Sequence, residues 1–310
     1  MNNLYDSIVI GASAAGMSAG IYLKRQKLNF LILTKDIGGE MALSGIIENY
    51  PGFPLTNGVE LTQKFKEHLE KYGIEPVIEE VVKIEKENFF KVVTSKNEYL
   101  SKTVIIATGS NPKKLNVPGE KEFYHKGVSY CYVCDMPLFP KKIVAIIGGG
   151  NSALESGILA SKICQKAYII NKNPKFKGDK ILFEEVSKKE NIEIIYNALT
   201  QEIYGDEFVR GIKYLDQNTG EIKDLKVDGV FIHIGLKPNT DFVPDEWQIK
   251  NEYGEIIVNE LCQTKIPGLF AAGDVTNIPH KQIGIAVGQG IISALEVVRY
   301  LNSQKQFLQE

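Results

Sequence analysis

Cys131 and Cys134 are separated by two residues, and Asp135 follows them directly. A spacer of two residues allows two thiols to close into a disulfide, and such pairs often contain one thiol of depressed pKa that attacks another disulfide. Each exchange moves a proton, and a neighbouring carboxyl group such as that of Asp135 is able to carry it. The segment therefore predicts redox chemistry at sulfur.

Structural zinc and simple burial are the alternatives for this pair. A zinc site requires four ligands, but Cys164 and Cys262 stand alone in helix-like and strand-like contexts and have the pattern of buried apolar residues. None of His125, His233 and His280 has the spacing of a ligand, so no metal is expected. Two inert buried thiols are also disfavoured, because a carboxyl group adjoins the pair.

Two short β-branched runs each end in a turn of small residues. Gly11 and Gly16 provide the tight turn and the close helix packing of a phosphate-binding loop, while Ser13 occupies the position of the middle glycine. The second loop fits the pattern better, and its residues are Gly148, Gly150, Asn151, Ser152 and Ala153.

A helix pattern and a second apolar run follow each of these turns. Strands are predicted over 7–10, 28–33, 142–147 and 167–170, and helices over 17–26 and from 153 to about 163. The helix N-terminus after each turn supplies amides and a positive dipole end to phosphates. Either turn alone also fits an ordinary connection without ligand, but two in one chain predict two dinucleotide-binding units. The alternation of strands and helices gives the α/β class.

The residues that close the second strand of each pattern bear on the choice of nucleotide. An acid there binds a ribose 2′-hydroxyl, and arginines bind a 2′-phosphate. Thr34 is uninformative, and the run from Asn171 to Lys177 contains neither an acid nor an arginine. Lys172 and Lys177 are able to meet a phosphate as point charges, but a solvated basic turn explains them equally well.

The bulk composition bears on partners and compartment. With a net charge of −2 and 44% hydrophobic residues, the chain gives no reason to expect nucleic acid or an acidic membrane surface as its partner. No secretory signal and no apolar run of membrane-spanning length is recognised, so a cytoplasmic protein is expected. The polar tail from Asn302 to Glu310 is expected to be loose.

These motifs together resemble the low-molecular-weight thioredoxin reductases, and the resemblance covers nearly the whole chain. A Cys-x-x-Cys-Asp segment just before a second nucleotide motif is highly specific, whereas each piece alone is not. The segments that carry the resemblance are Ile10 to Gly16, Gly38-Gly39-Glu40, Glu48 to Gly52, Ala107-Thr108-Gly109, Gly127 to Asp135, Gly148 to Ala153, Gly235 with Pro238-Asn239-Thr240, and Thr264 to Asp274.

The resemblance implies two Rossmann-like, three-layer domains, the second inserted in the first. An FAD-binding domain would comprise 1–113 and 243–310, and an NAD(P)H-binding-like domain that carries the cysteines would comprise 114–242. The resemblance also implies a homodimer, and a domain rotation that presents the flavin first to nicotinamide and then to the disulfide.

The resemblance also assigns roles by position. Cys134 would exchange electrons with the flavin, Cys131 would attack the disulfide of thioredoxin, and Asp135 would be the acid and base. The implied FAD-binding residues are Gly11, Ser13, Gly16, Gly39, Glu40, Asn49, Thr108, Gly109, Gly273, Asp274, Lys281 and Gln282. The implied residues for NADPH or NADH are Gly148, Gly150, Asn151, Ser152, Ala153, Lys172 and Lys177.

The chain departs from the family in ways that leave the electron donor open. NADPH-specific members carry His-Arg-Arg and a further Arg where this chain has Asn171, Lys172, Asn173 and Lys177. The donor is therefore NADPH, NADH or, as in some relatives of this family, reduced ferredoxin, for which the lysines between 172 and 180 would form a docking patch. Between the cysteines, Tyr132 and Val133 are bulkier than the usual small pair.

Two other functions remain open from the sequence alone. A ferredoxin–NADP⁺ reductase-like or peroxide-forming flavoprotein would not need Cys131 and Cys134, and a non-enzymatic flavin-binding redox module would not need a donor. The presence of both a redox pair and a second nucleotide motif favours the disulfide reductase.

Overall fold

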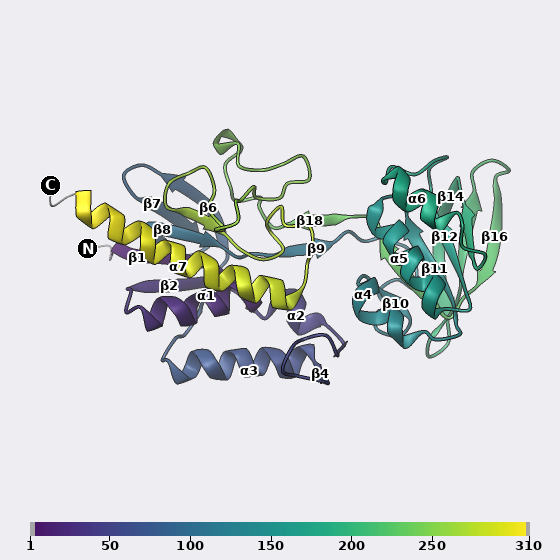
Figure 1. Ribbon diagram of the computed structural model, residues 1–310, viewed down its shortest axis with the longest axis horizontal. Helices are drawn as coiled ribbons and strands as arrows, with labels where there is room; N and C mark the ends of the chain where they lie inside the picture. The colour runs from purple at the N-terminus through teal and green to yellow at the C-terminus, as the bar shows by residue number, and fades with distance from the viewer. Residues whose placement is uncertain (1–3, 308–310) are drawn as a thin grey trace. The chain divides into compact units, whose positions relative to one another are not determined.

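The computed structural model describes residues 4–307 and divides the chain into two compact units. Unit 1 contains the segments up to Asn111 and from Lys237, and unit 2, Pro112–Leu236, is inserted between them (Figure 1). Each unit has a mainly parallel sheet with helices packed on one face. The predicted α/β class, with two Rossmann-like units and the second inserted in the first, is confirmed.

The chain passes between the units at two short strands that pair with each other, β9 (Ser110–Pro112) and β18 (Leu236–Pro238). The second crossing precedes the limit expected at residue 243. The reason is that Asn239 is already bonded to unit 1, because its side-chain Nδ2 donates to the Thr108 carbonyl oxygen at 2.9 Å.

The main sheet of unit 1 has the strand order β5-β2-β1-β8-β7-β6, and β19 also pairs with β8. The pairs β6–β7 and β7–β8 are antiparallel, and the other pairs are parallel. The further elements of unit 1 are β1 (Leu4–Ala12), α1 (Ala14–Arg25), β2 (Phe30–Ile37), α2 (Gly39–Leu43), β3 (Ile46–Ile47), β4 (Thr56–Asn57), α3 (Gly58–Lys71), β5 (Val77–Ile78), β6 (Val81–Lys86), β7 (Phe90–Thr94), β8 (Glu98–Ile106), a 3₁₀ helix (Asp245–Trp247), β19 (Leu269–Ala271) and α7 (Ile283–Phe307).

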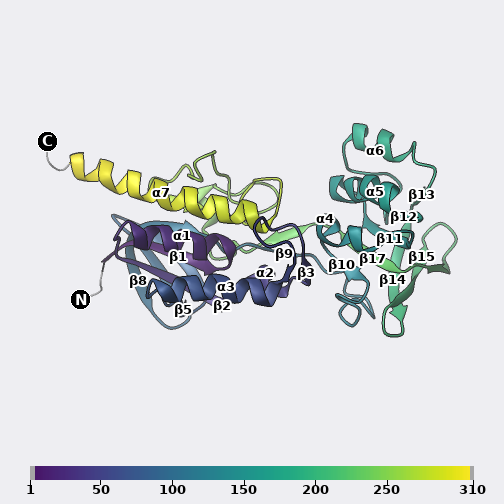
Figure 2. The same ribbon diagram turned by 60° about the horizontal axis from the view of Figure 1, so that its bottom comes forward.

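Alternate residues of β1 supply the two cores of unit 1. Val9 packs with helices α1, α3 and α7 on one face, while Ile8 and Ile10 pack on the other face against residues between 243 and 275. Helix α7 lies alongside α1 (Figures 1 and 2). The two approach so closely that a Cβ at Gly290 would lie 2.1 Å from the Ala15 carbonyl oxygen. This packing fixes the start of α1.

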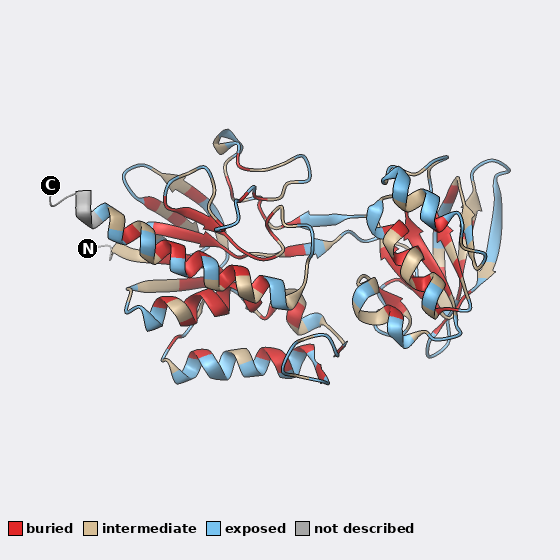
Figure 3. Cartoon of the chain, in the orientation of Figure 1, coloured by how far each residue is buried: buried red, intermediate tan, exposed pale blue. Residues whose placement is uncertain are grey.

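The sheet of unit 2 is parallel, with the order β10-β17-β11-β12-β13. Helices α5 and α6 cover one face, and the antiparallel sheet β14-β15-β16 covers the other. Figure 3 shows the buried residues gathered in the central strands and on the inner side of α5. The elements of unit 2 are β10 (Val128–Ser129), α4 (Tyr132–Asp135), a 3₁₀ helix (Met136–Leu138), β11 (Ile143–Gly148), α5 (Asn151–Ile163), β12 (Lys166–Ile170), α6 (Lys180–Val186), β13 (Ile192–Ile195), β14 (Ala198–Gly205), β15 (Val209–Asp216), β16 (Glu221–Lys226) and β17 (Gly229–His233).

Three local predictions differ from the structure. Strand β2 begins at Phe30 rather than Leu28, because Lys27 adopts a φ of +59° after the end of α1. Cys262 is buried as expected, but it lies in a turn with a φ of +58° rather than in a strand. The expectation of a loose tail is wrong for 302–307, which continue α7, while 308–310 lie outside the described residues. The polar residues of this stretch include good helix formers such as Gln and Lys.

Among the described residues, one stretch within α7, Ile283–Gln304, is long and apolar enough to cross a membrane by length and composition alone. The core helix of a globular protein passes the same test. Helix α7 buries Ala294, Val297 and Leu301 in the core that it shares with α1, and this packing accounts for its apolar face.

Candidate active site

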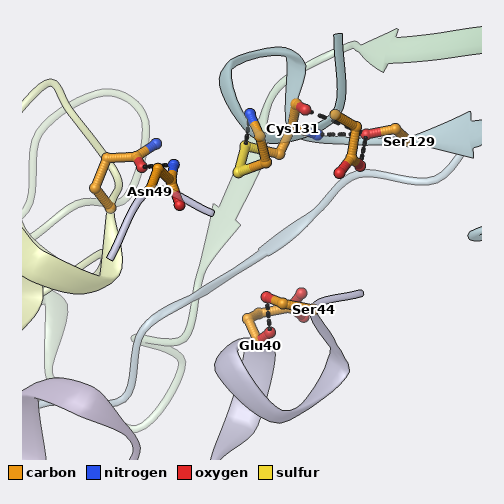
Figure 4. Close-up of a disulfide and its surroundings, with 8 residues drawn as sticks. Glu40, Ser44, Asn49, Ser129 and Cys131 are labelled. Atoms are coloured by element: carbon orange, nitrogen blue, oxygen red, sulfur yellow. Dashed lines mark hydrogen bonds between the residues drawn. A yellow bond between two sulfur atoms is a disulfide. The ribbon is translucent and has the colours of Figure 1, made fainter. Parts of the chain in front are cut away.

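Cys131 and Cys134 form a disulfide, with their Cα atoms 5.3 Å apart (Figure 4). Cys131 caps the single-turn helix α4, and the backbone N–H of Cys134 donates to the Cys131 sulfur at 3.2 Å. One helical turn brings residues three apart onto the same face, and this places the two sulfurs together. Cys164 and Cys262 are buried, and burial raises the pKa of each thiol to about 11, so neither is a thiolate at neutral pH.

Ser129 connects the disulfide segment to Asp135. Its hydroxyl donates to Asp135 Oδ2 at 2.6 Å, and its oxygen accepts from the backbone N–H of Cys131 at 3.0 Å (Figure 4). Burial raises the pKa of the Asp135 carboxyl group, while the Ser129 hydrogen bond and the charge of His125 offset part of that rise. A carboxyl group of raised pKa beside a disulfide is suited to carry the proton of thiol exchange.

Two tyrosines flank Cys131, and each is bonded to a carboxylate. The Tyr130 hydroxyl donates to Glu120 Oε1 at 2.8 Å, and the Tyr132 hydroxyl donates to Glu155 Oε2 at 2.9 Å. Both carboxylates belong to unit 2, so the segment on each side of Cys131 is fixed to the framework of that unit.

The glycine loop of unit 2 leaves the start of α5 open to an anion. Gly150 is the N-cap of α5 and provides no side-chain cap, and no atom lies within 4 Å of a Cβ built there. Uncapped amides of a first turn, together with the helix dipole, attract a phosphate. Gly148 is required for packing, since a Cβ there would lie 2.3 Å from the His233 carbonyl oxygen and 3.0 Å from the Cβ of Ala153. Ser152 is exposed on the first turn.

The loop after β12 is built around Asn171. Its buried side chain donates from Nδ2 to the Lys175 carbonyl oxygen at 3.1 Å and accepts at Oδ1 from the Asn173 backbone N–H at 3.0 Å. A Cβ at Gly149 would lie 2.7 Å from Asn171 Oδ1, so the asparagine fills the space under the glycine loop. Asn171 therefore shapes the loop and is bonded within it.

Lys172 and Lys177 are exposed on this loop, and the backbone N–H of Lys177 donates to the Gly149 carbonyl oxygen at 2.8 Å. Asn151 is bonded to the same loop. Its Oδ1 accepts from the Asp179 backbone N–H at 2.7 Å, and its Nδ2 donates to Asp179 Oδ2 at 2.9 Å. The backbone of the glycine loop and the two lysines thus remain available to a nucleotide, whereas the Asn151 side chain is engaged within the protein.

In unit 1 the loop before α1 is closed by backbone contacts that tolerate no side chain. Gly11 has a φ of +113°, and a Cβ there would lie 2.2 Å from the Ala107 carbonyl oxygen. A Cβ at Gly16 would lie 1.9 Å from the Gly11 carbonyl oxygen. Ser13 donates its hydroxyl to the Gly38 carbonyl oxygen at 2.6 Å and makes no capping bond to α1. The serine is accommodated in this way, and the start of α1 stays open to a phosphate.

The segment after β19 holds a carboxyl group in a partly buried position. Gly273 has a φ of +80° and donates its N–H to Gln289 Oε1 at 2.8 Å. Burial raises the pKa of Asp274, and Lys281 offsets part of that rise; Lys281 itself pairs with Glu255 at 3.0 Å. Within residues 4–307 the Asp274 carboxyl group has no hydrogen-bond donor, so it is able to accept bonds from the hydroxyls of a sugar-like chain.

The structure brings together other expected FAD-binding residues of unit 1 that are far apart in sequence. Asn49 Nδ2 donates to Gln282 Oε1 at 3.2 Å across 233 residues (Figure 4). The Thr108 hydroxyl donates to the Asn239 carbonyl oxygen at 2.7 Å, so it is engaged within the chain. Three expected residues of this unit remain. Gly39 and Glu40 are the first residues of α2, and Gly109 lies between β8 and β9.

Sequence reasoning missed three residues that organise these sites. Ser129 lies two positions before Cys131, and a hydroxyl so close to a redox pair is a signal that could have been used. Glu155 meets Tyr132, and Gln289 meets Gly273, only through tertiary packing within their own units, and no local pattern indicates either residue.

Comparison with known proteins identifies the family. Residues 5–290 match the family model described as pyridine nucleotide-disulphide oxidoreductase. The chain is 39% identical to an NADH dehydrogenase of Bacillus subtilis (strain 168), over 96% of its own length and 58% of that protein. It is 38% identical to the thioredoxin reductase of the same organism, over 98% of its own length and 97% of that protein. The crystal structure of thioredoxin reductase from Streptococcus pyogenes MGAS5005 has a TM-score of 0.91 and 37% identity, covering 98% of this chain and 100% of that one.

Two nucleotide-binding units, one of which carries a redox disulfide, are the architecture of the pyridine nucleotide-disulphide oxidoreductases, and the chain belongs to this family. Within the family, similarity along the full length places it with the low-molecular-weight thioredoxin reductases, as the motifs predict. The chain spans 57–59% of the length of the longer relatives that it matches, among them the NADH dehydrogenase.

Proposed function

We propose that the protein is an FAD-dependent disulfide reductase that passes electrons from a reduced nicotinamide nucleotide, through Cys131 and Cys134, to a thioredoxin-like protein. The observation that carries the proposal is the disulfide in the same compact unit as the open phosphate cradle at Gly150. The Bacillus thioredoxin reductase, which has nearly the same length, supports it.

The residues of unit 1 fit FAD. The open start of α1 suits a pyrophosphate, and the Asp274 carboxyl group suits the ribityl hydroxyls. Gln282, held by Asn49 just before α7, would lie near the flavin ring. When bound, FAD supplies two-electron chemistry between a nicotinamide and a disulfide.

The redox pair would act by two successive exchanges. In the dithiol state, the Cys131 thiolate would attack the partner's disulfide, form a mixed disulfide and displace one partner sulfur, to which Asp135 would give a proton. Cys134 would then pass its own proton to Asp135 and attack the Cys131 sulfur. This step would re-form the Cys131–Cys134 disulfide and release the second partner sulfur as a thiolate, which Asp135 would protonate, so that two electrons reach the partner.

Among the donors, several observations favour NADH. The run from Asn171 to Lys177 contains no arginine, and Asn171 is buried as a loop-shaping residue. Exposed Lys172 and Lys177 offer only point charges to a 2′-phosphate. One relative that covers 96% of the chain is named an NADH dehydrogenase.

Anaerobic bleaching of the oxidised-flavin absorbance tests the donor. We expect fast bleaching by NADH, half-saturating at about a tenfold lower concentration than NADPH, since the 2′-phosphate lacks a bidentate partner. A lower half-saturating concentration for NADPH would contradict the choice of NADH alone. Bleaching only by reduced ferredoxin would overturn the nicotinamide donor and make the Gly148 loop a structural turn.

Replacing Asp135 by asparagine is expected to slow reduction of a thioredoxin-like disulfide by about 100-fold, because it removes the proton carrier, and to leave bleaching by NADH unchanged.

Since burial raises the pKa of Asp135, the wild-type rate of disulfide reduction should fall only at a pH above the usual range of aspartate pKa values. Ser129→Ala removes a hydrogen bond that lowers this pKa, so the fall should move to higher pH. A pH–rate profile that is identical in Ser129→Ala and wild type would contradict this role.

We also propose that the protein is a homodimer that associates through unit 1. Ile46, Leu55 and Val59 are 52%, 65% and 71% exposed, and a subunit contact would cover such apolar residues. Sedimentation velocity should then give twice the chain mass of 34.5 kDa, and a monomer at micromolar concentration would contradict the proposal.

A further inference from the structure

Tyr132, the residue that follows Cys131, connects the redox helix to the nucleotide cradle. Its hydroxyl donates to Glu155 Oε2 on α5 at 2.9 Å. Its ring stands edge-on to the imidazole of His233, with centroids 5.3 Å apart and planes at 90°. His233 ends β17 and lies opposite Gly148 in the parallel pairing of β17 with β11. The spacer between the cysteines therefore contacts the strand and the helix that build the cradle.

These contacts lie on one side of the predicted dinucleotide crevice. On one side of β11 in the sheet lies β12, the next strand along the chain. On the other side lies β17, the last strand of the five in this sheet, so the strand order reverses between β11 and β17. A dinucleotide crosses the sheet at such a point, with its pyrophosphate on the glycine loop and its adenosine ribose at the end of the second strand, here β12. The nicotinamide half then falls on the side of β17, where Tyr132 and His233 lie.

Two polar groups on this side match a nicotinamide carboxamide, which has one NH₂ and one carbonyl oxygen. The Glu155 carboxylate is able to accept a hydrogen bond from the NH₂ group, and it now accepts one from the Tyr132 hydroxyl. His233 Nε2 is excluded from solvent and has no hydrogen-bond partner among the residues that the structure describes. Burial lowers the pKa of His233 to about 4, so its ring is neutral and able to donate or accept one bond. A buried polar atom without a partner is costly, and a ligand that supplies one is favoured.

We propose that Tyr132 competes with the nicotinamide carboxamide for Glu155, so that the tyrosine between the redox cysteines occupies the nicotinamide half of the site until a dinucleotide displaces it. The inference rests on the proposed function, because it requires a nicotinamide donor. Since binding must break the Tyr132–Glu155 hydrogen bond, the tyrosine lowers the affinity for the dinucleotide and links nucleotide binding to the position of the redox helix α4.

The test compares two ligands that differ only on the nicotinamide side. Tetrahydro-NADH carries a carboxamide but donates no hydride, and ADP-ribose lacks the nicotinamide. Both are titrated calorimetrically into the full-length, oxidised, FAD-loaded protein. We expect Tyr132→Phe to bind tetrahydro-NADH about tenfold more tightly than wild type, from the loss of one hydrogen bond to a charged group, and to bind ADP-ribose equally well.

Glu155→Ala provides the matched background. It should bind tetrahydro-NADH more weakly than wild type and ADP-ribose equally well, and Tyr132→Phe should have no further effect once Glu155 is gone. Unchanged or weaker binding of tetrahydro-NADH by Tyr132→Phe would overturn the competition while leaving the nicotinamide donor intact. Tightening in the Glu155→Ala background, or of ADP-ribose, would also overturn it. Failure of the wild-type protein to bind either ligand would overturn both the competition and the nicotinamide donor.

Discussion

Cys134→Ser is expected to reduce the rate of protein-disulfide reduction by about three orders of magnitude or more, while flavin bleaching by NADH keeps its wild-type rate. The single-turn helix α4 brings the Cys134 and Cys131 sulfurs into one disulfide, and this is the only cysteine pair among residues 4–307 that is bonded. Without Cys134 the remaining thiol has no partner to store two electrons, and a mixed disulfide formed at Cys131 cannot be resolved. Stopped-flow bleaching measures flavin reduction by NADH, and steady-state thiol release from a thioredoxin-like substrate measures protein-disulfide reduction.

Cys164→Ala is the matched control for this variant. Cys164 is buried, its sulfur lies 3.5 Å from the Met136 sulfur, and burial raises its thiol pKa to about 11, so it has no thiolate to contribute. Its loss should change disulfide reduction by no more than about twofold, with only a small packing cost. If Cys134→Ser kept its activity with protein disulfides, the exchange mechanism would be removed and a flavoprotein that does not use its thiols would take its place.

The architecture could be predicted because its signals are local. A β-branched run, a glycine turn and a small-residue helix stand side by side in the chain, and their order alone fixes a βαβ unit. Helix α1 and strand β11 accordingly lie within two or three residues of the expected bounds. The end of α7 cannot be predicted in the same way, because a polar stretch such as 302–307 fits a loose tail and a helical end equally well.

The chemistry of the site was only partly predictable. Residues adjacent in sequence, such as Cys131, Cys134 and Asp135, were recognised because their spacing itself carries the chemistry. Glu155 was not, because its contact with Tyr132 spans 23 residues and exists only once α4 and α5 pack on the same sheet. The sequence shows Asn171 only as a position that lacks an acid or an arginine, and its role in shaping the loop under Gly149 depends on burial that no spacing reveals.

Gly11→Ala is expected to cause the largest loss of flavin among single substitutions in unit 1. A methyl group at Gly11 meets the Ala107 carbonyl oxygen at 2.2 Å, and the φ of +113° is unfavourable for any residue with a Cβ. The two effects together should destabilise unit 1 by about 4 kcal/mol or more, because backbone must move at the junction of β1, α1 and the chain after β8. The flavin-to-protein absorbance ratio after purification, and the temperature at which flavin fluorescence is released, measure the effect.

Substitutions at two other glycines separate the effect of the positive φ from the effect of the steric overlap. Gly52→Ala has the same kind of strain, with a φ of +93°, but nothing lies within 4 Å of its Cβ, so it should cost only about 1–2 kcal/mol and retain flavin. Gly16→Ala carries no positive-φ strain, yet its Cβ would lie 1.9 Å from the Gly11 carbonyl oxygen, so it should lose flavin nearly as severely as Gly11→Ala. If Gly16→Ala kept its flavin and its release temperature, the close approach of α1 to the end of β1 would not be what holds the pyrophosphate. The open N-terminus of α1 would then have to bind its phosphate through the Ser13–Gly39 side of the loop, where the Ser13 hydroxyl already holds the Gly38 carbonyl oxygen.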